Sequence, residues 1–109
     1  MLKYNHVGIH TNIKRDNEVY LPSFKMFVSG CEESIYRIEW MRFEDDCPLP
    51  EIIKTVPHVA FEVDNLEEAI KGKDIIIEPN SPSAGVIVAF IEDNGVPVEL
   101  MQYLARQCI

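Results

Sequence analysis

The sequence has few cysteines and no long apolar run. Its three cysteines, Cys31, Cys47 and Cys108, are odd in number and widely spaced, with no CxxC pair among them. We therefore expect free thiols rather than a disulfide framework or a thiolate zinc site. No apolar run approaches the ~20 residues of a membrane helix, and the first residues lack the apolar centre of a signal peptide. These absences predict a cytoplasmic protein that has no membrane partner.

Positive charge is also scarce. Lys and Arg number 10 against 18 Asp and Glu, so the formal net charge is −8 at pH 7. Proteins hold nucleic acids chiefly through cationic side chains that replace the counterions of the phosphates. The sequence therefore predicts no nucleic-acid partner. A Gly-rich phosphate loop, a Ser nucleophile elbow and an HExxH motif are also missing.

The chain is long enough for one compact domain. Of its 109 residues, 47% are hydrophobic, which is enough to form a modest core. We predict a single domain over residues 1–109, of the α+β class.

The second half of the chain has the clearest secondary-structure pattern. Residues 58–63 are typical of a short strand. Asp64 and Glu67 have the spacing of a capping box, and the apolar positions that follow predict a helix over residues 66–73. Gly72 can end that helix in the left-handed conformation. Three strands are then predicted, over residues 74–78, 86–92 and 96–103. The predicted order is strand, helix and three strands.

Two turns separate these last strands. Pro79 closes the strand over 74–78, and residues 80–85 are predicted to form a loop. Asn94-Gly95 joins the next two strands. This dipeptide strongly indicates a two-residue hairpin turn, because both central residues of the favoured turn need a positive φ.

The first half of the chain repeats this order in a shorter form. His6-Val7-Gly8-Ile9 corresponds to His58-Val59-Ala60-Phe61, and residues 38–43 correspond to residues 98–103, which keep the acid, the methionine and the terminal aromatic. Such self-similarity indicates two copies of one unit. We call these copies module one, about residues 1–47, and module two, about residues 56–104.

Module one is predicted to lack the helix of module two. The spacing from His to Glu is 33 residues between His6 and Glu39 and 41 residues between His58 and Glu99. The difference of 8 residues is the length of the predicted helix. Residues 11–22 show no helical apolar period, and residues 24–28 and 34–43 are typical of strands. The expected fold is a pair of βαβββ-type modules whose curved mixed sheets surround a cavity.

Strand alternation places one His and one Glu of each module on a common face, because side chains two residues apart point the same way. His6 shares its face with Gly8, and His58 shares its face with Ala60. We expect these two small residues to leave room for water or substrate. The opposite faces are apolar and are expected to form the core.

His6, Glu39, His58 and Glu99 together form a candidate metal site. Imidazole nitrogens and carboxylate oxygens suit zinc, nickel, cobalt, manganese or ferrous iron. Taken singly, a strand His is usually a hydrogen-bonded structural residue and a strand Glu is usually solvated. The metal site is favoured here because all four residues recur at matching ends of two copies of one unit.

The residues that carry these patterns resemble those of the vicinal oxygen chelate superfamily, which includes glyoxalase I, bleomycin-resistance proteins, fosfomycin-resistance enzymes, extradiol dioxygenases and methylmalonyl-CoA epimerase. The resemblance lies in His6-Val7-Gly8-Ile9, in residues 57–66 and in residues 89–100, where an aromatic strand, an acidic Gly turn and a second strand lead to Glu99. It is firm over residues 57–103 and weaker before residue 43.

The resemblance implies a metal at His6, Glu39, His58 and Glu99, in the order His, Glu, His, Glu that is most similar to glyoxalase I. It implies that the metal stabilises an oxyanion or enediolate formed on two adjacent substrate oxygens. Glu99, and by symmetry Glu39, are then the candidate catalytic bases. The sequence has no Arg and Asn cluster that would bind glutathione. The residues expected to line the pocket are His10, Met41, Glu62, Met101 and Tyr103.

Two classes of function follow from these observations. The first is a metal-dependent lyase or isomerase that acts on a small oxygen-rich metabolite. The second is a metal-free module that sequesters a small ligand, similar to bleomycin-resistance proteins. Arg37 and Arg42 are candidates for holding an anionic substrate, although both residue types are more often found on the surface of a strand. Open edges of an incomplete barrel predict a homodimer.

Overall fold

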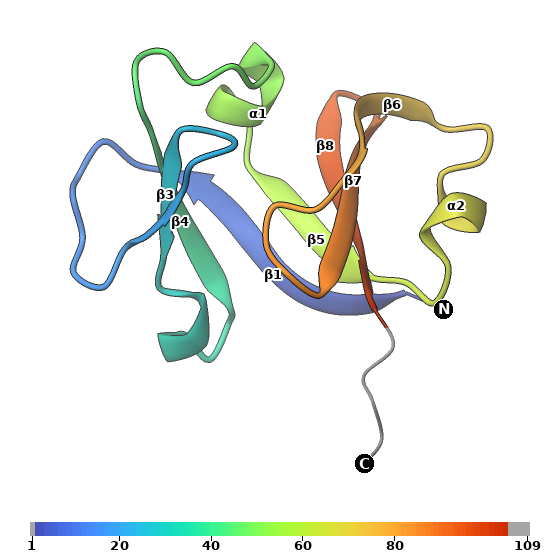
Figure 1. Ribbon diagram of the computed structural model, residues 1–109, viewed down its shortest axis with the longest axis horizontal. Coiled ribbons are helices and arrows are strands. Elements are labelled where there is room, and N and C mark those ends of the chain that lie inside the picture. The colour runs from blue at the N-terminus through green and yellow to red at the C-terminus, as the bar shows by residue number, and fades with distance from the viewer. Residues whose placement is uncertain (1, 105–109) are drawn as a thin grey trace.

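The computed structural model describes residues 2–104 as mostly β structure with short helices (Figure 1). In chain order the elements are β1 (Lys3–His10), β2 (Val19–Leu21), β3 (Met26–Ser29), the 3-10 helix η1 (Cys31–Glu33), β4 (Ile38–Phe43), α1 (Glu51–Thr55), β5 (His58–Glu62), α2 (Leu66–Ala69), β6 (Asp74–Asn80), β7 (Val86–Asp93) and β8 (Val96–Tyr103).

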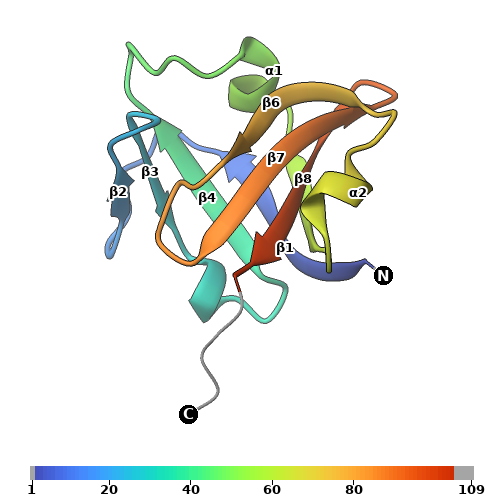
Figure 2. The ribbon, with the colours of Figure 1, turned by 45° about the vertical axis from the view of Figure 1, so that its right-hand side comes forward.

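All of the strands belong to one curled sheet, in the order β2-β3-β4-β1-β5-β8-β7-β6. β1 pairs with β4 in parallel, β5 pairs with β8 in parallel, and the two halves meet where β1 runs antiparallel to β5. Figures 1 and 2 show the sheet bent into half a barrel, with β3 and β4 facing β7 and β8 across the interior. The predicted fold class is confirmed, with the two expected sheets joined into one.

The missing helix of module one is replaced by long side chains. Among the described residues, no helix lies between β1 and β2. The guanidinium of Arg15 instead lies 5.6 Å from the ring centre of Trp40. That of Arg42 lies 4.2 Å from the ring centre of Phe27 and binds Glu18 through two hydrogen bonds of 2.7 and 2.8 Å. Two arginines thus lie over aromatic rings of β3 and β4 in this half of the sheet.

Two layers of apolar side chains lie on either side of β7 and β8. On the outer side, α2 packs over a cluster formed by Leu66, Ala89, Ile91 and Leu100. On the inner side of the curl, a second cluster consists of Ala60, Val86, Val88 and Met101. Consecutive residues of β7, from Val88 to Ile91, are therefore buried, because each face of the strand is covered by one of the two layers. The inner layer lies on the same face of the sheet as the four candidate ligands.

The helix of module two is shorter than predicted. α2 ends at Ala69 rather than at residue 73, because the chain continues in turns up to Gly72, whose φ is +72°. The cap lies one residue later than expected. Asn65 is the N-cap, and its side chain accepts a hydrogen bond of 3.0 Å from the backbone N–H of Glu68, whereas the sequence favoured Asp64 with Glu67.

Strand ends in module one also differ from the prediction. β4 begins at Ile38 rather than at residue 34, because a turn precedes it in which Arg37 has a φ of +57°. β3 begins at Met26 because Phe24 lies in the turn that follows β2. The short strand β2 and the helix α1 were not predicted. Buried Ile53 anchors α1, which lies in the segment that joins the modules.

Other details agree with the sequence or extend it. Asn94 and Gly95 have φ values of +50° and +86°, which confirms the predicted hairpin turn. β6 continues through Pro79 to Asn80, two residues beyond the predicted end. Cys31 and Cys47 are free thiols, and Cys108 lies outside the described residues. No helix within residues 2–104 is long and apolar enough to cross a membrane.

Candidate metal centre

The four candidate ligands occupy two neighbouring rows that run across the centre of the sheet. In one row, Gly8 of β1 is paired with Glu39 on one side and with His58 on the other. In the adjacent row, Ala60 of β5 is paired with His6 and with Glu99. Paired residues point to the same face of a sheet. The duplicated pattern in the sequence therefore brings all four side chains to the inner face of the curl.

Three of these side chains meet at one point. Nε2 of His58 lies 3.0 Å from Oε1 of Glu99, and Nε2 of His6 lies 3.3 Å from the same oxygen. The two Nε2 atoms are 3.3 Å apart. One ligand atom from each of His6, His58 and Glu99 lies within 4.8 Å of the others, and all three residues are buried. We call these three residues the ligand cluster.

Glu39 lies at the edge of the ligand cluster. Its Oε1 is 3.5 Å from Nε2 of His6, and its side chain is 23% exposed, compared with 10% for Glu99. It also lines the cavity in front of the cluster. The two acids, which the sequence treats as equivalent, therefore have different surroundings.

Gly8 makes room for a histidine ring. A Cβ atom at Gly8 would lie 2.1 Å from Cε1 of His58, which is closer than any real contact. Ala60, which is paired with His6, is fully buried in the inner core. The expectation that these small residues leave room for water or substrate was therefore wrong. Gly8 instead allows His58 to lie across β1.

A hydrogen-bonded chain orients His6. Nδ2 of Asn5 donates to Oε2 of Glu62 at 3.0 Å, which directs Oδ1 of the same amide toward Nδ1 of His6 at 2.6 Å. Since Oδ1 only accepts, Nδ1 of His6 carries a proton, and in the neutral ring Nε2 therefore presents a lone pair to the cluster. Metal-binding histidines commonly have such a partner. Nδ1 of His58, by contrast, is buried without a hydrogen-bond partner among the described residues.

A β-bulge explains why Asn5 and His6 both face the interior. The pairing of β1 with β5 shifts between Tyr4 and His6, and neighbouring Asn5 and His6 are both buried. Bulges often redirect a side chain next to a functional site. Strand alternation places Asn5 on the opposite face from His6, so Asn5 is not among the predicted site residues.

The charges of the cluster shift its pKa values in opposite directions. Burial raises the pKa of Glu99, but hydrogen bonds from His58 and His6 outweigh burial and lower it to about 2. Burial lowers the pKa of His6, but its hydrogen bond with Glu99 and the charges of Glu39 and Glu99 outweigh burial and raise it. For Glu39, burial raises the pKa, and the nearby histidines only partly oppose this. Glu99 is thus firmly ionised, whereas Glu39 binds a proton more readily.

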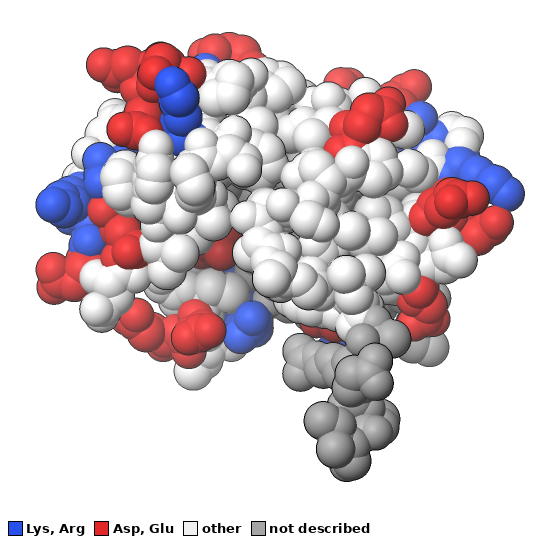
Figure 3. Space-filling view, in the orientation of Figure 1, with Lys and Arg blue, Asp and Glu red and all other residues white. Residues whose placement is uncertain are grey.

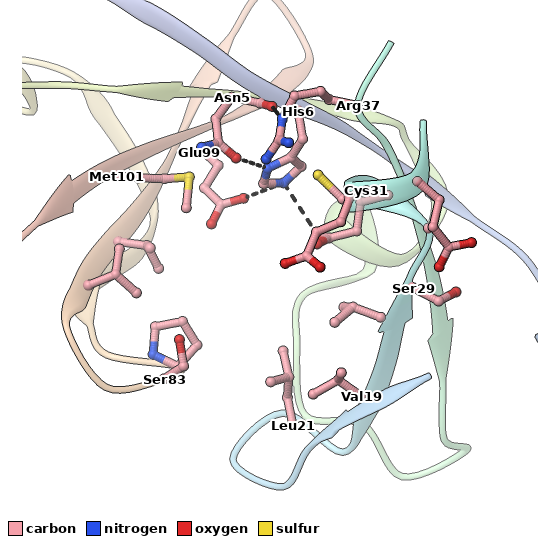
Figure 4. A pocket seen from close by; sticks show the side chains of 18 of the residues that line it. Asn5, His6, Val19, Leu21, Ser29, Cys31, Arg37, Ser83, Glu99 and Met101 are labelled. Atoms are coloured by element: carbon pink, nitrogen blue, oxygen red, sulfur yellow. Dashed lines mark hydrogen bonds and ion pairs between the residues drawn. The ribbon is translucent and has the colours of Figure 1, made fainter. Parts of the chain in front are cut away.

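A cavity of about 640 Å³ opens in front of the cluster. Figure 4 shows Glu99 and Met101 on one side of it, Cys31 on the other side, and Val19 and Leu21 on its far wall. Burial raises the pKa of the Cys31 thiol. A volume of this order is typical of small-molecule sites.

The residues expected to line the pocket lie in four different places. Met101 and Tyr103 line this cavity, and Met41 lines a smaller chamber behind it. Glu62 binds Asn5 as described above. His10 lies away from the cavity at the end of β1, where its Nε2 is 3.1 Å from Oδ1 of Asn12 and its ring lies 5.9 Å from the ring of Phe43.

The two candidate arginines also have different surroundings. Arg42 is paired with Glu18 on the outer face, as described above. Arg37 lines the cavity, and its Nε donates a hydrogen bond of 2.7 Å to the backbone carbonyl of Asn5. Within residues 2–104 no carboxylate forms an ion pair with Arg37. Its remaining N–H groups are therefore candidates for an anionic ligand.

The donor set fits a divalent metal ion. Two imidazole nitrogens and a carboxylate converge, and the tautomer of His6 is set by Asn5, as metal binding requires. Thiolates are not part of the set, which suits zinc, nickel, cobalt, manganese or ferrous iron in a site that keeps open positions. The ligand cluster can therefore hold such an ion.

Comparison with known proteins extends only to the fold. No protein-family model matches the sequence, and no curated protein matches it significantly. The crystal structure of hypothetical protein BH1468 from Bacillus halodurans C-125 superimposes with a TM-score of 0.72 and 22% sequence identity, covering 99% of both chains. The chain thus shares its whole fold with BH1468, and its curled mixed half-barrel is consistent with that of the vicinal oxygen chelate superfamily.

Proposed function

We propose that the protein belongs to the vicinal oxygen chelate superfamily and is a divalent-metal-dependent lyase or isomerase that acts on a small oxygen-rich metabolite. The observation that carries this proposal is the convergence of His6, His58 and Glu99 within 4.8 Å at the base of a cavity of small-molecule size. A divalent ion held there, when bound, supplies a Lewis acid that stabilises negative charge on two adjacent substrate oxygens.

We assign different roles to the two acids. Glu99 is buried and ionised, and it contacts both histidines, so it holds the metal. Glu39 faces the cavity and has a raised pKa, which suits a general base that takes a proton from a carbon atom of the substrate. Arg37, at the wall of the same cavity, binds an anionic group of the substrate and so orients it against Glu39.

One observation favours metal-free ligand binding as a second candidate function. The cluster satisfies part of its own hydrogen bonding, since Glu99 accepts from Nε2–H of His58 and, when the His6 ring is protonated on both nitrogens, from His6 as well. Such a cluster is stable without an ion, and the cavity alone has the size of a ligand site. The protein would then sequester a small molecule, as bleomycin-resistance proteins do.

Proton exchange separates these two functions without knowledge of the product. Metal-loaded protein in D₂O is incubated with small compounds that carry two adjacent oxygens, namely hydroxy acids, hydroxyketones and α-oxoaldehyde hemithioacetals, and NMR follows the loss of the neighbouring C–H signal. We expect exchange with at least one compound, and we expect it to stop when a chelator removes the metal.

The control is His10→Ala, which removes a histidine outside the cluster and should leave exchange unchanged. Binding of these compounds without exchange, at equal affinity with and without metal, would favour the sequestering protein and contradict the enzyme.

A further inference from the structure

A second, smaller chamber lies behind the ligand cluster. It has a volume of about 60 Å³ and shares Glu39 and Glu99 with the larger cavity. Its deep walls come from the turn after β2, from β4, from the segment around α1 and from β6 and β7, and the side chains that form them are Phe24, Met41, Leu49, Ile53, Ile77 and Phe90.

The deep walls of the chamber are apolar. All six side chains are apolar, and the polar groups that line the chamber, Glu39, His58 and Glu99, belong to the candidate metal centre. Water in the deep part would lack the two to four polar partners that a buried water needs. The chamber therefore suits an apolar group that extends from something seated at the centre.

The size of the chamber limits that group. A buried water needs roughly 10–15 Å³ of free volume, so about 60 Å³ holds roughly four groups of that order of size, such as methyl or methylene groups. Rings and long chains exceed this volume. The adjoining cavity of about 640 Å³ takes the larger, polar part of a ligand.

Resting on the proposed function, we propose that the chamber is a specificity subsite for a short alkyl group of about two to four carbons, carried by a substrate whose two adjacent oxygens are presented to His6, His58 and Glu99. Phe24 and Leu49 set the length of this group, because both are half-buried side chains from loops that form part of the chamber wall. The polar remainder of the substrate lies in the larger cavity beside Arg37.

Straight-chain alkyl hydroxamates test the subsite, because their two adjacent oxygens chelate divalent metals while the chain length varies. Cobalt-loaded protein is titrated with hydroxamates that carry alkyl chains of one to seven carbons, and the visible absorption of cobalt gives each Kd. Affinity should rise about fourfold per added methylene, the ratio equivalent to ~0.8 kcal/mol per buried CH₂. The rise should stop at about three or four carbons, when the chamber is full.

Two variants should move this limit in opposite directions. Phe24→Ala widens the chamber, so that chains of five or six carbons should gain at least threefold relative to the wild type. Leu49→Phe fills it, so that longer chains should bind no more tightly than the methyl compound. The matched control is Phe27→Ala, which removes the same atoms from β3 but on the outer face beside Arg42, and which should keep the wild-type profile.

The outcomes separate this subsite from the proposed function. If cobalt and the hydroxamates bind but the Kd does not depend on chain length, or if Phe24→Ala and Phe27→Ala give the same profile, the subsite is refuted while the metal centre stands. If cobalt does not bind to the wild type at all, the proposed function fails and the subsite fails with it.

Discussion

Asn5 shows how one side chain sets the chemistry of its neighbour. Its amide is fixed by Glu62 on one side and accepts from Nδ1 of His6 on the other, which leaves Nε2 of His6 unprotonated and directed at the cluster. A histidine that is free to adopt the other tautomer would lose part of its affinity for a metal. Asn5 is thus a positioning residue of the candidate metal centre.

Replacing Asn5 should therefore weaken metal binding. We expect Asn5→Ala to lower zinc affinity by about 10- to 100-fold, the usual effect of removing the partner of a metal-binding histidine, as measured by calorimetric titration. Asn12→Ala is the matched control because it removes the asparagine that contacts His10, and it should have no effect. Equal affinities in both variants and the wild type would show that Asn5 does not orient His6.

The two acids of the site should fail in different ways. Glu99→Gln removes the charge shared by both histidines, so the number of metal ions bound per chain should fall. Glu39→Gln should keep the metal but abolish C–H exchange in D₂O, because it removes the base. Elemental analysis and NMR on the same samples measure both effects. The control is Glu92→Gln, because Glu92 is an exposed residue of β7. Full exchange by Glu39→Gln would assign the base to another group.

At the scale of elements, the pairing of β1 with β5 builds the site. The antiparallel register places Gly8 opposite His58, so a backbone position without a side chain is needed where the ring crosses the neighbouring strand. We expect Gly8→Ala to displace the ring, to cost about 1–3 kcal/mol of unfolding free energy as overpacking does, and to reduce metal binding. Thermal melting and elemental analysis measure the two effects.

Gly72→Ala is the control for Gly8→Ala. A Cβ atom at Gly72 meets nothing within 4 Å, but its φ of +72° makes the substitution strained. This variant should lower the melting temperature and leave metal binding intact. Normal metal binding by Gly8→Ala would mean that the His58 ring has another place to lie.

The sequence predicts the central strands well, because apolar and polar residues alternate along them and because the same pattern occurs in both modules. The hairpin turn at Asn94-Gly95 is predictable for a different reason, because its conformation depends on the positive φ of these two residues alone. The bulge beside Asn5 and the turn at Arg37 depend instead on how β1 and β4 pair with other strands, and no local pattern indicates them. Helix α1 is short and held by one buried residue, Ile53, so its periodicity is too weak to recognise.

The chamber behind the cluster could not be predicted from the sequence either. Its walls come from segments far apart in the chain, such as Phe24, Leu49 and Ile77, which meet only because the sheet curls. The convergence of His6, His58 and Glu99 could be anticipated because each lies at a repeated position. The homodimer and the cytoplasmic location stay predictions.

In the whole molecule, the candidate metal centre connects the two modules. His6 and Glu39 come from module one, and His58 and Glu99 from module two, so the cluster joins both halves of the sheet. Figure 3 shows charged side chains mainly around the rim of one face and uncharged side chains over its centre. A metal ion bound by both halves should stabilise the fold, by about 2.7 kcal/mol at a hundredfold excess over Kd.

The stability of the metal-free protein should be highest in weakly acidic solution. The lowered pKa of Glu99 gives stability that is present above its ordinary value of 4.5 and is lost as the pH falls toward about 2. The raised pKa of His6 gives stability that is present below its ordinary value of 6.5 and is lost as the pH rises through the raised value. The raised pKa of Glu39 gives stability that is present below its ordinary value of 4.5 and is lost as the pH rises through its raised value.

Metal should reverse this trend, because it binds the deprotonated form of His6. Melting temperatures from pH 4 to 9, with chelator and with zinc, should converge at low pH and separate increasingly above the raised pKa of His6. A zinc-induced shift of the same size at pH 5 and pH 8 would show that the metal binds elsewhere.

The number of metal ions bound per chain tests whether His6, His58 and Glu99 form a metal centre. Wild type, His58→Ala and His10→Ala are each incubated with zinc, nickel, cobalt or manganese, freed of excess metal and measured by elemental analysis. For at least one metal, the cluster predicts one ion per chain in the wild type and in His10→Ala, and almost none in His58→Ala. A wild type that retains none of the four metals, or a His58→Ala variant that retains as much metal as the wild type, would contradict a metal centre at His6, His58 and Glu99.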